Sequence, residues 1–332
     1  MITTRINFSL LQFLLGKKEL DDVIYEIEKH AEYSEYYKAV YNILLLLKEG
    51  NVKQLFDSAV SLFYSTKFDD VTDITSDDNI PFLLSLEIIL SYINALDHLT
   101  PMKKEKLLSD ILHGIDRGYN IWIGLRERKR ANNLQKMKGY IYGILGIELM
   151  KKEKYDLAAD CFIRALQIHK AFKQRDLERI DFFNLGICML ETRRYEEGIH
   201  FLKKAALDEN DLIAKKYLGI GYLLKKDYIQ ANEIFSELYY KADLKTPEIV
   251  YYLTLVNFAG FLEKKIPEGD KEGQKFYKLL LSMGPLWTVS AHLIRGMYYA
   301  IQEDYSSAAN EFIDALSIMT DYLKIKRKNN LI

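Results

Sequence analysis

The side chains that most often carry catalysis or bind metal ions are sparse in this chain, and they are not spaced for either task. None of the six histidines has another histidine four residues away or a cysteine beside it, so we expect no metal site. These histidines are His30, His98, His113, His169, His200 and His292. No glycine-rich phosphate loop and no nucleophile elbow occurs in the sequence. The sequence therefore predicts a protein that is not an enzyme and that uses no cofactor.

The two cysteines, Cys161 and Cys188, both lie in stretches of helical apolar spacing. Free cysteines pack as small apolar side chains in proteins of a reducing compartment, and this is the interpretation we favour. A disulfide or a redox role is the alternative.

Charge gives little reason to expect a nucleic acid or a membrane as partner. The chain has 46 basic and 47 acidic residues, so its net charge is about −1 and no overall field attracts polyanions. The densest basic stretch, residues 126–130, follows Trp122 and is compatible with a phosphate or nucleic-acid patch, but a solvated helix face fits the balanced charge better. We expect no nucleic-acid binding.

The N-terminus and the hydropathy pattern indicate where the protein resides. No apolar run reaches the roughly 18 residues that a membrane-spanning helix needs. Arg5 followed by the apolar residues 8–15 resembles the core of a short signal peptide, but no small-x-small cleavage site follows and the stretch runs into charged residues. We expect a cytoplasmic protein with no transmembrane segment, a secreted or periplasmic location being the alternative.

One spaced pattern occurs four times in the chain, and it specifies the elements. A Gly is followed by a Tyr nine residues later, a small residue at plus twelve, a bulky apolar residue at plus sixteen and a small or apolar residue at plus nineteen. The copies are Gly146/Tyr155/Ala158/Phe162/Ala165, Gly186/Tyr195/Gly198/Leu202/Ala205, Gly219/Tyr228/Ala231/Phe235/Leu238 and Gly296/Tyr305/Ala308/Phe312/Ala315. Apolar residues run at helical spacing on both sides of a polar break, so each copy predicts two helices joined by a tight turn. The small residues would let the two helices approach closely.

This pattern resembles the tetratricopeptide repeat (TPR), a helix-turn-helix unit of 34 residues. The residues that carry the resemblance are the Leu-Gly pairs that end at Gly146, Gly186 and Gly219, the tyrosines of the turns, and the small and bulky residues of each second helix. The last copy departs from the pattern in having Arg295 before its Gly, and the second has Gly198 where Ala is usual. The spacing is less regular than the content, and we expect residues 169–179 to extend a second helix or its loop. The resemblance implies an all-α fold, an α-solenoid of TPR-like repeats.

We predict the following organisation along the chain. Residues 1–66 form N-terminal helical hairpins or a cap, 67–81 an acidic connector, and 82–130 one or more degenerate helical hairpins. Within this part we expect an apolar helix over residues 82–99 and a helix from Pro101 to about Arg117, with Gly114 and Gly118 at its end. The TPR array spans 139–322, with repeats near 139–172, 179–211, 212–245, 247–284 (degenerate) and 289–322. Residues 323–332 form a basic C-terminal tail.

The resemblance also implies where a partner would bind. In this family the first helix of each repeat lines a concave groove, and its groove-facing residues stand six and three before, and one and four after, the Gly. In this chain most of these positions are apolar. The candidate partner-binding residues are Tyr140, Ile147, Met150, Ile180, Phe183, Ile187, Leu190, Ile213, Lys216, Ile220, Leu223, Leu293 and Met297.

The chemistry of these candidate residues limits the partner. Family members that clasp the carboxylate of a peptide tail have Asn after the Gly, where this chain has Ile or Met, and Lys216 is the only cation among the candidates. We therefore expect a protein or peptide partner that lays an apolar helix or strand in the groove. Filling of the groove by the chain itself is the alternative interpretation.

The sequence favours a scaffold or adaptor that holds protein partners in a multi-protein assembly. Two alternatives share the apolar groove: a peptide-sensing regulatory protein, and a chaperone for a secreted or aggregation-prone client. Against the regulator, residues 1–65 show no convincing helix-turn-helix pattern for DNA binding.

Overall fold

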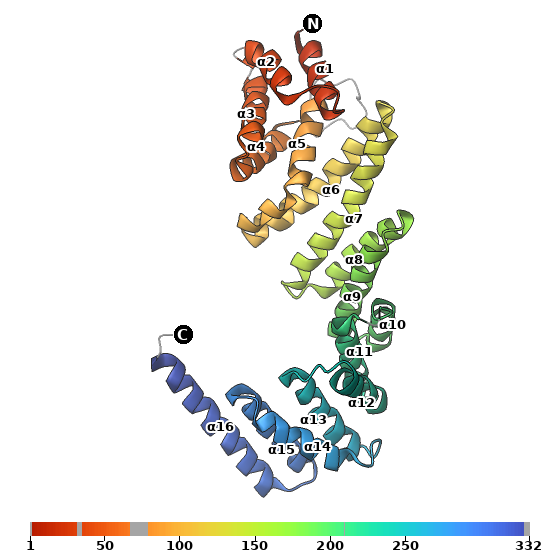
Figure 1. Ribbon diagram of the computed structural model, residues 1–332, viewed down its shortest axis with the longest axis vertical. Coiled ribbons are helices and arrows are strands. Elements are labelled where there is room, and N and C mark those ends of the chain that lie inside the picture. Colours follow the sequence, from red (N-terminus) through yellow and green to blue (C-terminus); the bar gives the residue numbers. More distant parts are fainter. Residues whose placement is uncertain (1, 32–34, 67–78, 209, 329–332) are drawn as a thin grey trace. The chain divides into compact units, whose positions relative to one another are not determined.

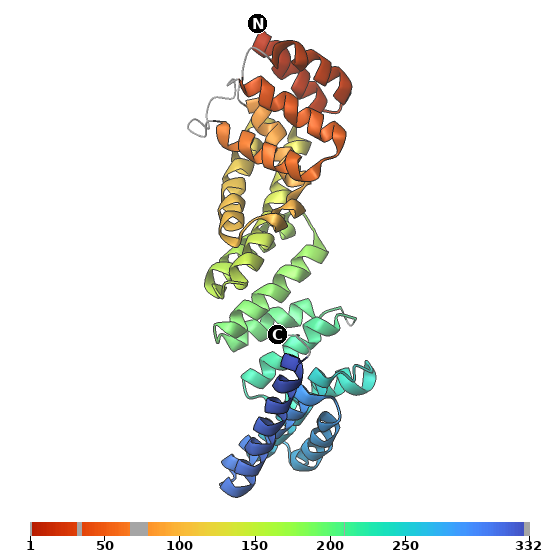
Figure 2. The ribbon, with the colours of Figure 1, turned by 90° about the vertical axis from the view of Figure 1, so that its left-hand side faces the viewer.

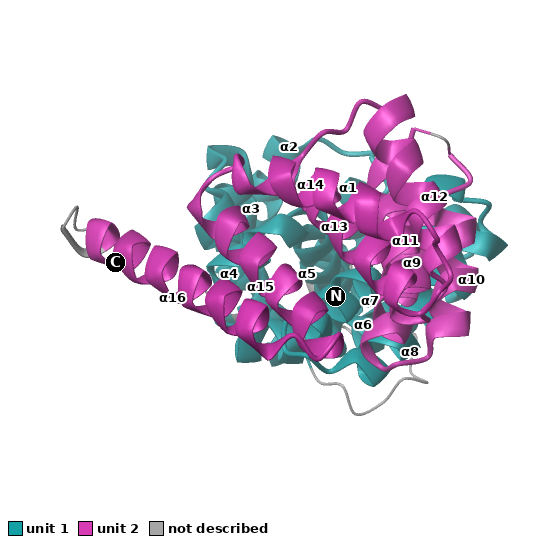
Figure 3. Cartoon of the chain, turned by 90° about the horizontal axis from the view of Figure 1, so that it is seen from below, with its two compact units in different colours: residues 1–178 teal, residues 179–332 magenta. Residues whose placement is uncertain are grey.

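The computed structural model describes residues 2–31, 35–66, 79–208 and 210–328, and these residues form helices and turns only (Figure 1). They group into two compact units, Met1–Glu178 and Arg179–Ile332, called unit 1 and unit 2 below (Figure 3). The apolar cores follow this division, because one cluster of buried side chains runs from Ile6 to Ile141 and another from Ile199 to Tyr298. The all-α, TPR-like repeat fold expected from the sequence is confirmed.

Unit 1 begins with helices that pack as hairpins. They are α1 (Ile2–Leu14), α2 (Leu20–Ala31), α3 (Glu35–Glu49), α4 (Val52–Ser65) and α5 (Asn79–Ser91). The apolar stretch near the N-terminus is α1, and its residues Ile6, Leu10 and Leu14 are buried in the core of unit 1. Their spacing of four residues places them on one face of the helix, which is the face that packs.

Two expectations for the region after α4 need correction. Most of the acidic connector predicted over 67–81 lies outside the described residues, but 79–81 belong to the first turn of α5, where Asn79 and Pro81 are buried. The helix expected over residues 82–99 ends at Ser91 and is followed by a 3₁₀ helix, Ile93–His98. Thr100 then adopts an extended conformation, as expected for a residue that precedes proline.

Helix α6 (Pro101–Gly124) is longer than the sequence suggested, and the expected end near Arg117 is wrong. Gly114 and Gly118 lie inside this helix rather than at its end. A Cβ atom on Gly114 would lie 2.7 Å from the ring of Phe63, and one on Gly118 would lie 2.9 Å from a methyl group of Leu134. Both glycines therefore serve the close approach of neighbouring helices.

The repeats follow as antiparallel helix pairs. Unit 1 ends with α7 (Arg128–Met150), α8 (Tyr155–Ala171) and the first turn of the next helix, and unit 2 contains the rest of that helix and the remaining pairs. These are α9 (Arg175–Glu191) with α10 (Tyr195–Ala205), α11 (Leu212–Leu224) with α12 (Tyr228–Ser236), α13 (Pro247–Leu262) with α14 (Gly269–Leu281), and α15 (Pro285–Ile301) with α16 (Tyr305–Lys328). A short π-helix, Glu237–Lys241, continues α12. Every tyrosine that the pattern placed at the start of a second helix begins one.

Helix ends differ from the predicted segments in three places. The boundaries at 130 and 139 fall inside α7, which begins at Arg128. The extra residues 169–179 lengthen both α8 and α9, leaving a short turn at 172–174. Residues 323–328 of the predicted basic tail continue α16.

The turn inside each of the four patterned repeats contains a residue that the pattern did not single out. Seven residues after each Gly, the backbone is left-handed with φ near +60°, and this residue is never glycine. The four residues are Glu153, Arg193, Lys226 and Glu303. The amide of the next residue donates to a carbonyl five residues back, as Lys154 does to Leu149 at 3.0 Å. This Schellman-type closure ends the first helix and orients the second.

Candidate functional site

The small residues of each repeat fix how its first helix is rotated. In the repeat formed by α9 and α10, a Cβ atom on Gly186 would lie 2.5 Å from Cγ of Leu202 and 3.3 Å from the carbonyl oxygen of Gly198. The same kind of contact joins Gly146 to Phe162, Gly219 to Phe235 and Gly296 to Phe312. Because the Gly must face the second helix, the residues on the other side of the first helix face away from it.

Side-chain contacts place the first helices of unit 2 next to one another. The rings of Phe183 in α9 and Tyr217 in α11 meet edge to face, with centroids 5.3 Å apart. Lys216 in α11 bonds to Glu248 in α13, and the ring of Tyr251 in α13 lies 6.2 Å from that of Trp287 in α15. The four first helices therefore form one layer.

Four predicted partner-binding residues of this layer are exposed. The exposed fraction is 50% for Ile180, 61% for Ile213, 43% for Leu293 and 49% for Met297. Half-buried predicted residues of the same helices are Phe183, Ile187, Lys216, Ile220 and Leu223. We call these nine residues together the first-helix face of unit 2.

Leu190 does not belong to this face, and its prediction as a partner-binding residue is wrong. Its side chain is buried. A Cβ atom on Gly198 would lie only 2.7 Å from the Cδ2 atom of Leu190, and a Cβ atom on Gly221 would lie 3.4 Å from the same atom. Leu190 thus fills the space that glycines in α10 and α11 leave open. The spacing rule placed it on the surface because it took no account of the second glycine in each of these two repeats.

Lys216 does not act as a free cation. Its Nζ atom donates to both carboxylate oxygens of Glu248, at 3.0 and 2.9 Å. Glu248 belongs to the degenerate repeat, which offered no Gly from which to count, so the pairing was not visible in the sequence. The positive charge of Lys216 is therefore compensated within the protein.

The degenerate repeat hides further residues of this layer. Helix α13 starts 35 residues after α11, so Thr254 takes the place of Gly219, and Tyr251 and Leu255 take the outward-facing places. Both are half-buried. The repeat was hard to align because the sizes are exchanged: the large Phe258 stands on the first helix and packs against Gly273 of the second, whose Cβ would lie 2.6 Å from the ring. Counting positions from the start of each helix, rather than from the Gly, would have identified Tyr251 and Leu255.

The predicted residues of unit 1 lie on α7. Tyr140 and Ile147 are exposed, with exposed fractions of 39% and 41%, and Met150 is half-buried. Around α7, Ile147 and Tyr140 stand about 100° and 120° from Gly146, which faces Phe162, whereas Met150 stands only about 40° from it.

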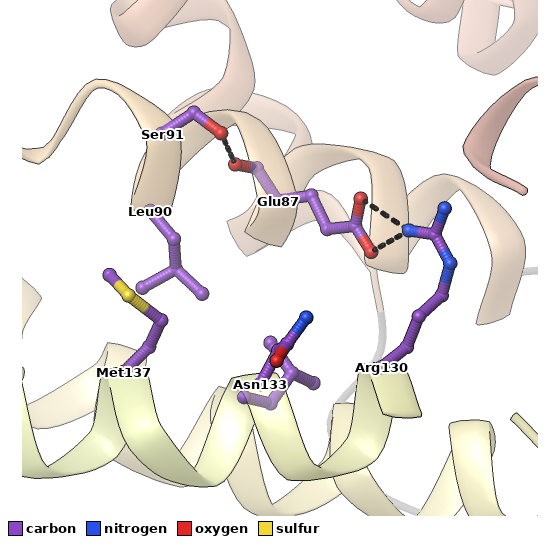
Figure 4. A pocket seen from close by; sticks show the side chains of 7 residues that line it. Glu87, Leu90, Ser91, Arg130, Asn133 and Met137 are labelled. Carbon is purple, nitrogen blue, oxygen red and sulfur yellow. Dashed lines mark hydrogen bonds and ion pairs between the residues drawn. The ribbon is translucent and has the colours of Figure 1, made fainter. Parts of the chain in front are cut away.

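A pocket of about 240 Å³ lies between α5 and α7 of unit 1 (Figure 4). Arg130 donates to both carboxylate oxygens of Glu87, at 3.2 and 3.3 Å, and its guanidinium group lies 5.2 Å from the ring of Trp122. Burial raises the pKa of Glu87 more than the Arg130 ion pair lowers it. The charged groups of the pocket are paired with each other, and Arg130 of the basic stretch thus has a structural partner.

The remaining candidate chemistry is not assembled into a site within the described part of the chain. No group of three or more His, Cys, Asp or Glu side chains there is arranged to hold a metal ion. Cys161 and Cys188 are both buried, and burial raises the pKa of Cys161 to about 11. None of the described helices combines the length and the apolar character that crossing a bilayer requires.

The sequence matches no protein-family model and no curated protein. In fold, the chain is similar to the apo form of RapI, with 14% identity and a TM-score of 0.38 over 87% of this chain and 100% of that one. It is similar to the C-terminal part of a TPR repeat-containing protein from Cytophaga hutchinsonii, with 15% identity and a TM-score of 0.41 over 71% and 95% of the two chains. A STAND protein with a TPR sensor from Pyrococcus horikoshii gives 14% identity and a TM-score of 0.46, over 92% of this chain and 45% of that chain. Similarities of this size say nothing about what the present chain binds.

Proposed function

We propose that this chain is a non-enzymatic protein-interaction scaffold that binds an apolar helix or strand of a partner on the first-helix face of unit 2. The observation that supports this proposal is the exposure of Ile180, Ile213, Leu293 and Met297 on helices of a single layer. Apolar surface contributes roughly 25 cal/mol per Å² when it is removed from water, so exposed apolar residues on one layer of helices are a place where a partner gains free energy.

The chemistry of the face indicates what kind of segment would fit. The aromatic pair Phe183 and Tyr217 lies on the same helices as the exposed isoleucines, and Lys216 is neutralised by Glu248. A partner therefore meets apolar anchors rather than an uncompensated charge, which suits spaced apolar side chains of a helix or strand. Within unit 2, no described side chain covers the four exposed residues, which favours a partner over filling by the unit itself.

The test compares capture of partners by two matched variants. Ile180→Asp combined with Ile213→Asp should abolish capture of the proteins that the wild-type chain retains from its source cell, identified by mass spectrometry. A charge in a desolvated contact costs several kcal/mol, and at an exposed position it leaves the fold unchanged. The control is Ile229→Asp on the second helix α12, where Ile229 is similarly exposed at 49%.

The outcomes separate binding from folding. Circular dichroism and the melting temperature should be nearly the same for the wild type and both variants. If the double variant retains the same proteins as the wild type, the first-helix face is not the binding surface. A large fall in its melting temperature would show instead that the chain covers these residues itself.

A further inference from the structure

The last helix of unit 2, α16, has an apolar face that is largely exposed, although its Phe312 also packs against Gly296 of α15. Phe312 stands at the bulky position of the repeat pattern, and its exposed fraction is 39%. The equivalent residues Phe162, Leu202 and Phe235 are completely buried. In the repeat formed by α11 and α12 the cover is visible, because the ring of Phe235 stacks on Tyr252 of the following helix with centroids 4.9 Å apart.

The uncovered residues of α16 form one stripe along the helix. At 100° per residue, the exposed residues within about 40° of the direction of Leu316, which is 69% exposed, are Tyr305 at the start of α16 and five residues further along the helix. These five are Ala309, Phe312, Leu316, Thr320 and Leu323, and we call them the α16 stripe. An adjacent side of the helix, about 80–100° around from Leu316, packs on α15 through the buried Ala308 and Ala315, and the two views in Figures 1 and 2 show α16 lying along α15.

The order of side-chain sizes in the α16 stripe is complementary to itself. Large and small residues stand at equal distances on either side of Leu316: Phe312 with Thr320, and Leu323 with Ala309. If two α16 helices pack antiparallel with Leu316 at the centre, each large side chain comes level with a small one of the other copy. This is the arrangement that a two-fold interface requires, because the same patch must fit itself.

The charges of α16 fit the same arrangement. The stripe contains no charged residue, so two copies bring no like charges together at its centre. Glu303 and Asp304 precede the helix, whereas Lys324 and Lys326 stand near its end. An antiparallel pair places the acidic start of one helix beside the basic end of the other, and it also opposes the two helix dipoles.

We propose that the occupant of the α16 stripe is a second copy of this chain, which forms a two-fold dimer through antiparallel α16 helices centred on Leu316. This interface is separate from the first-helix face of unit 2. The dimer therefore presents two partner-binding faces, one from each copy.

The oligomeric state of the full chain tests the proposal. Light scattering coupled to gel filtration should give twice the chain mass for the wild type and for Ile229→Asp, which adds the same charge on α12. Leu316→Asp should give the single chain mass, with helicity by circular dichroism unchanged because Leu316 is exposed. A wild type that remains monomeric at the highest soluble concentration, or a Leu316→Asp variant that remains dimeric, overturns the proposal.

A cysteine cross-link tests the antiparallel register. Leu316→Cys stands on the two-fold axis and should form a disulfide-linked dimer under mild oxidation. Ser306→Cys, also exposed on α16, should not, because ten residues from the centre it lies roughly 30 Å from its counterpart. Cross-linking of both variants would mean parallel helices, and cross-linking of neither would mean that another surface holds the chains together; each result overturns the arrangement proposed.

Discussion

At the scale of single residues, the close contact at Gly186 is the most sensitive point of the repeat. Its Cβ position is 2.5 Å from Cγ of Leu202, a fully buried side chain that would have to shift to make room for a methyl group. Gly186→Ala should therefore lower the free energy of unfolding by about 1–3 kcal/mol through overpacking. Urea denaturation followed by circular dichroism measures this change.

Gly143 in α7 provides the matched control. It also lies inside a helix, but a Cβ atom there would meet nothing within 4 Å. Gly143→Ala should raise stability by about 0.5–1 kcal/mol, because alanine loses less conformational freedom in a helix than glycine. If the two substitutions change stability by the same amount and sign, the contact with Leu202 does not explain the Gly in the repeat.

Two carboxylates of unit 1, the half-buried Glu87 and the buried Glu148, lie among charged partners but respond to pH with opposite signs. Burial raises the pKa of Glu87 more than Arg130 lowers it. At Glu148 burial acts in the same direction, but hydrogen bonds from Lys151 at 2.8 Å and from Lys104 at 3.0 Å outweigh it, and the pKa is lowered. At Glu87, one arginine does not offset the effect of burial on the pKa, whereas at Glu148 two lysines do.

The sign of each shift sets the expected pH dependence. The folded state holds the proton of Glu87 more tightly than the unfolded state, so the advantage of the wild type over Glu87→Gln is greatest at acidic pH and is lost as the pH rises through the folded pKa. The contribution of Glu148 is present above its ordinary pKa and is lost as the pH falls through the lowered one. At neutral pH, Glu148→Gln should cost about 2 kcal/mol, whereas Glu87→Gln should cost nothing. Unfolding measured from acidic to neutral pH checks both, and parallel profiles for the two variants would contradict this account.

At the scale of elements, the sequence predicted the four patterned repeats well because a Gly on one helix and a bulky residue on the other leave a regular signal. It placed α13 and α14 only as a degenerate repeat over residues 247–284, because Phe258 and Gly273 exchange these roles while filling the same space. The contact between the two helices is preserved, but the pattern that reveals it is inverted. A size rule applied to the pair of helices, rather than to each helix, would recover such a repeat.

The helix ends of α6 show a second limit of local patterns. Gly114 and Gly118 read as helix-ending residues, but they lie against Phe63 and Leu134, which are far away in the sequence. The turn residues such as Lys226 end a helix in the left-handed conformation although they are not glycines, because the hydrogen bonds of the turn hold them there. In both cases tertiary contacts decide what local preference leaves open.

For the candidate site, the sequence could predict which positions point outward but not what meets them there. The exposed Ile180 and Ile213 follow from the register of their helices. The burial of Leu190 and the pairing of Lys216 with Glu248 depend on neighbouring repeats, which a rule counted within one repeat does not contain.

At the scale of the whole molecule, each unit contains its own apolar core. The core of unit 1 is made of side chains from α1 to α7, and the core of unit 2 of side chains from α10 to α15. Helical repeat proteins gain their stability from such local contacts between successive elements, so a cut between elements of different cores removes few of them. Helices α8 and α9 contribute to neither core, so the turn between them, at residues 172–174, is the place for such a cut.

We therefore expect fragments 1–173 and 174–332 to fold separately, each with a cooperative thermal transition in calorimetry and native-like helicity. The second fragment contains both the first-helix face of unit 2 and the α16 stripe, so it should dimerise, and Leu316→Asp should make it monomeric. A fragment 174–332 that folds but stays monomeric while the full chain dimerises would show that unit 1 contributes to the dimer. If neither fragment unfolds cooperatively, the two cores depend on one another and the chain folds as a single unit.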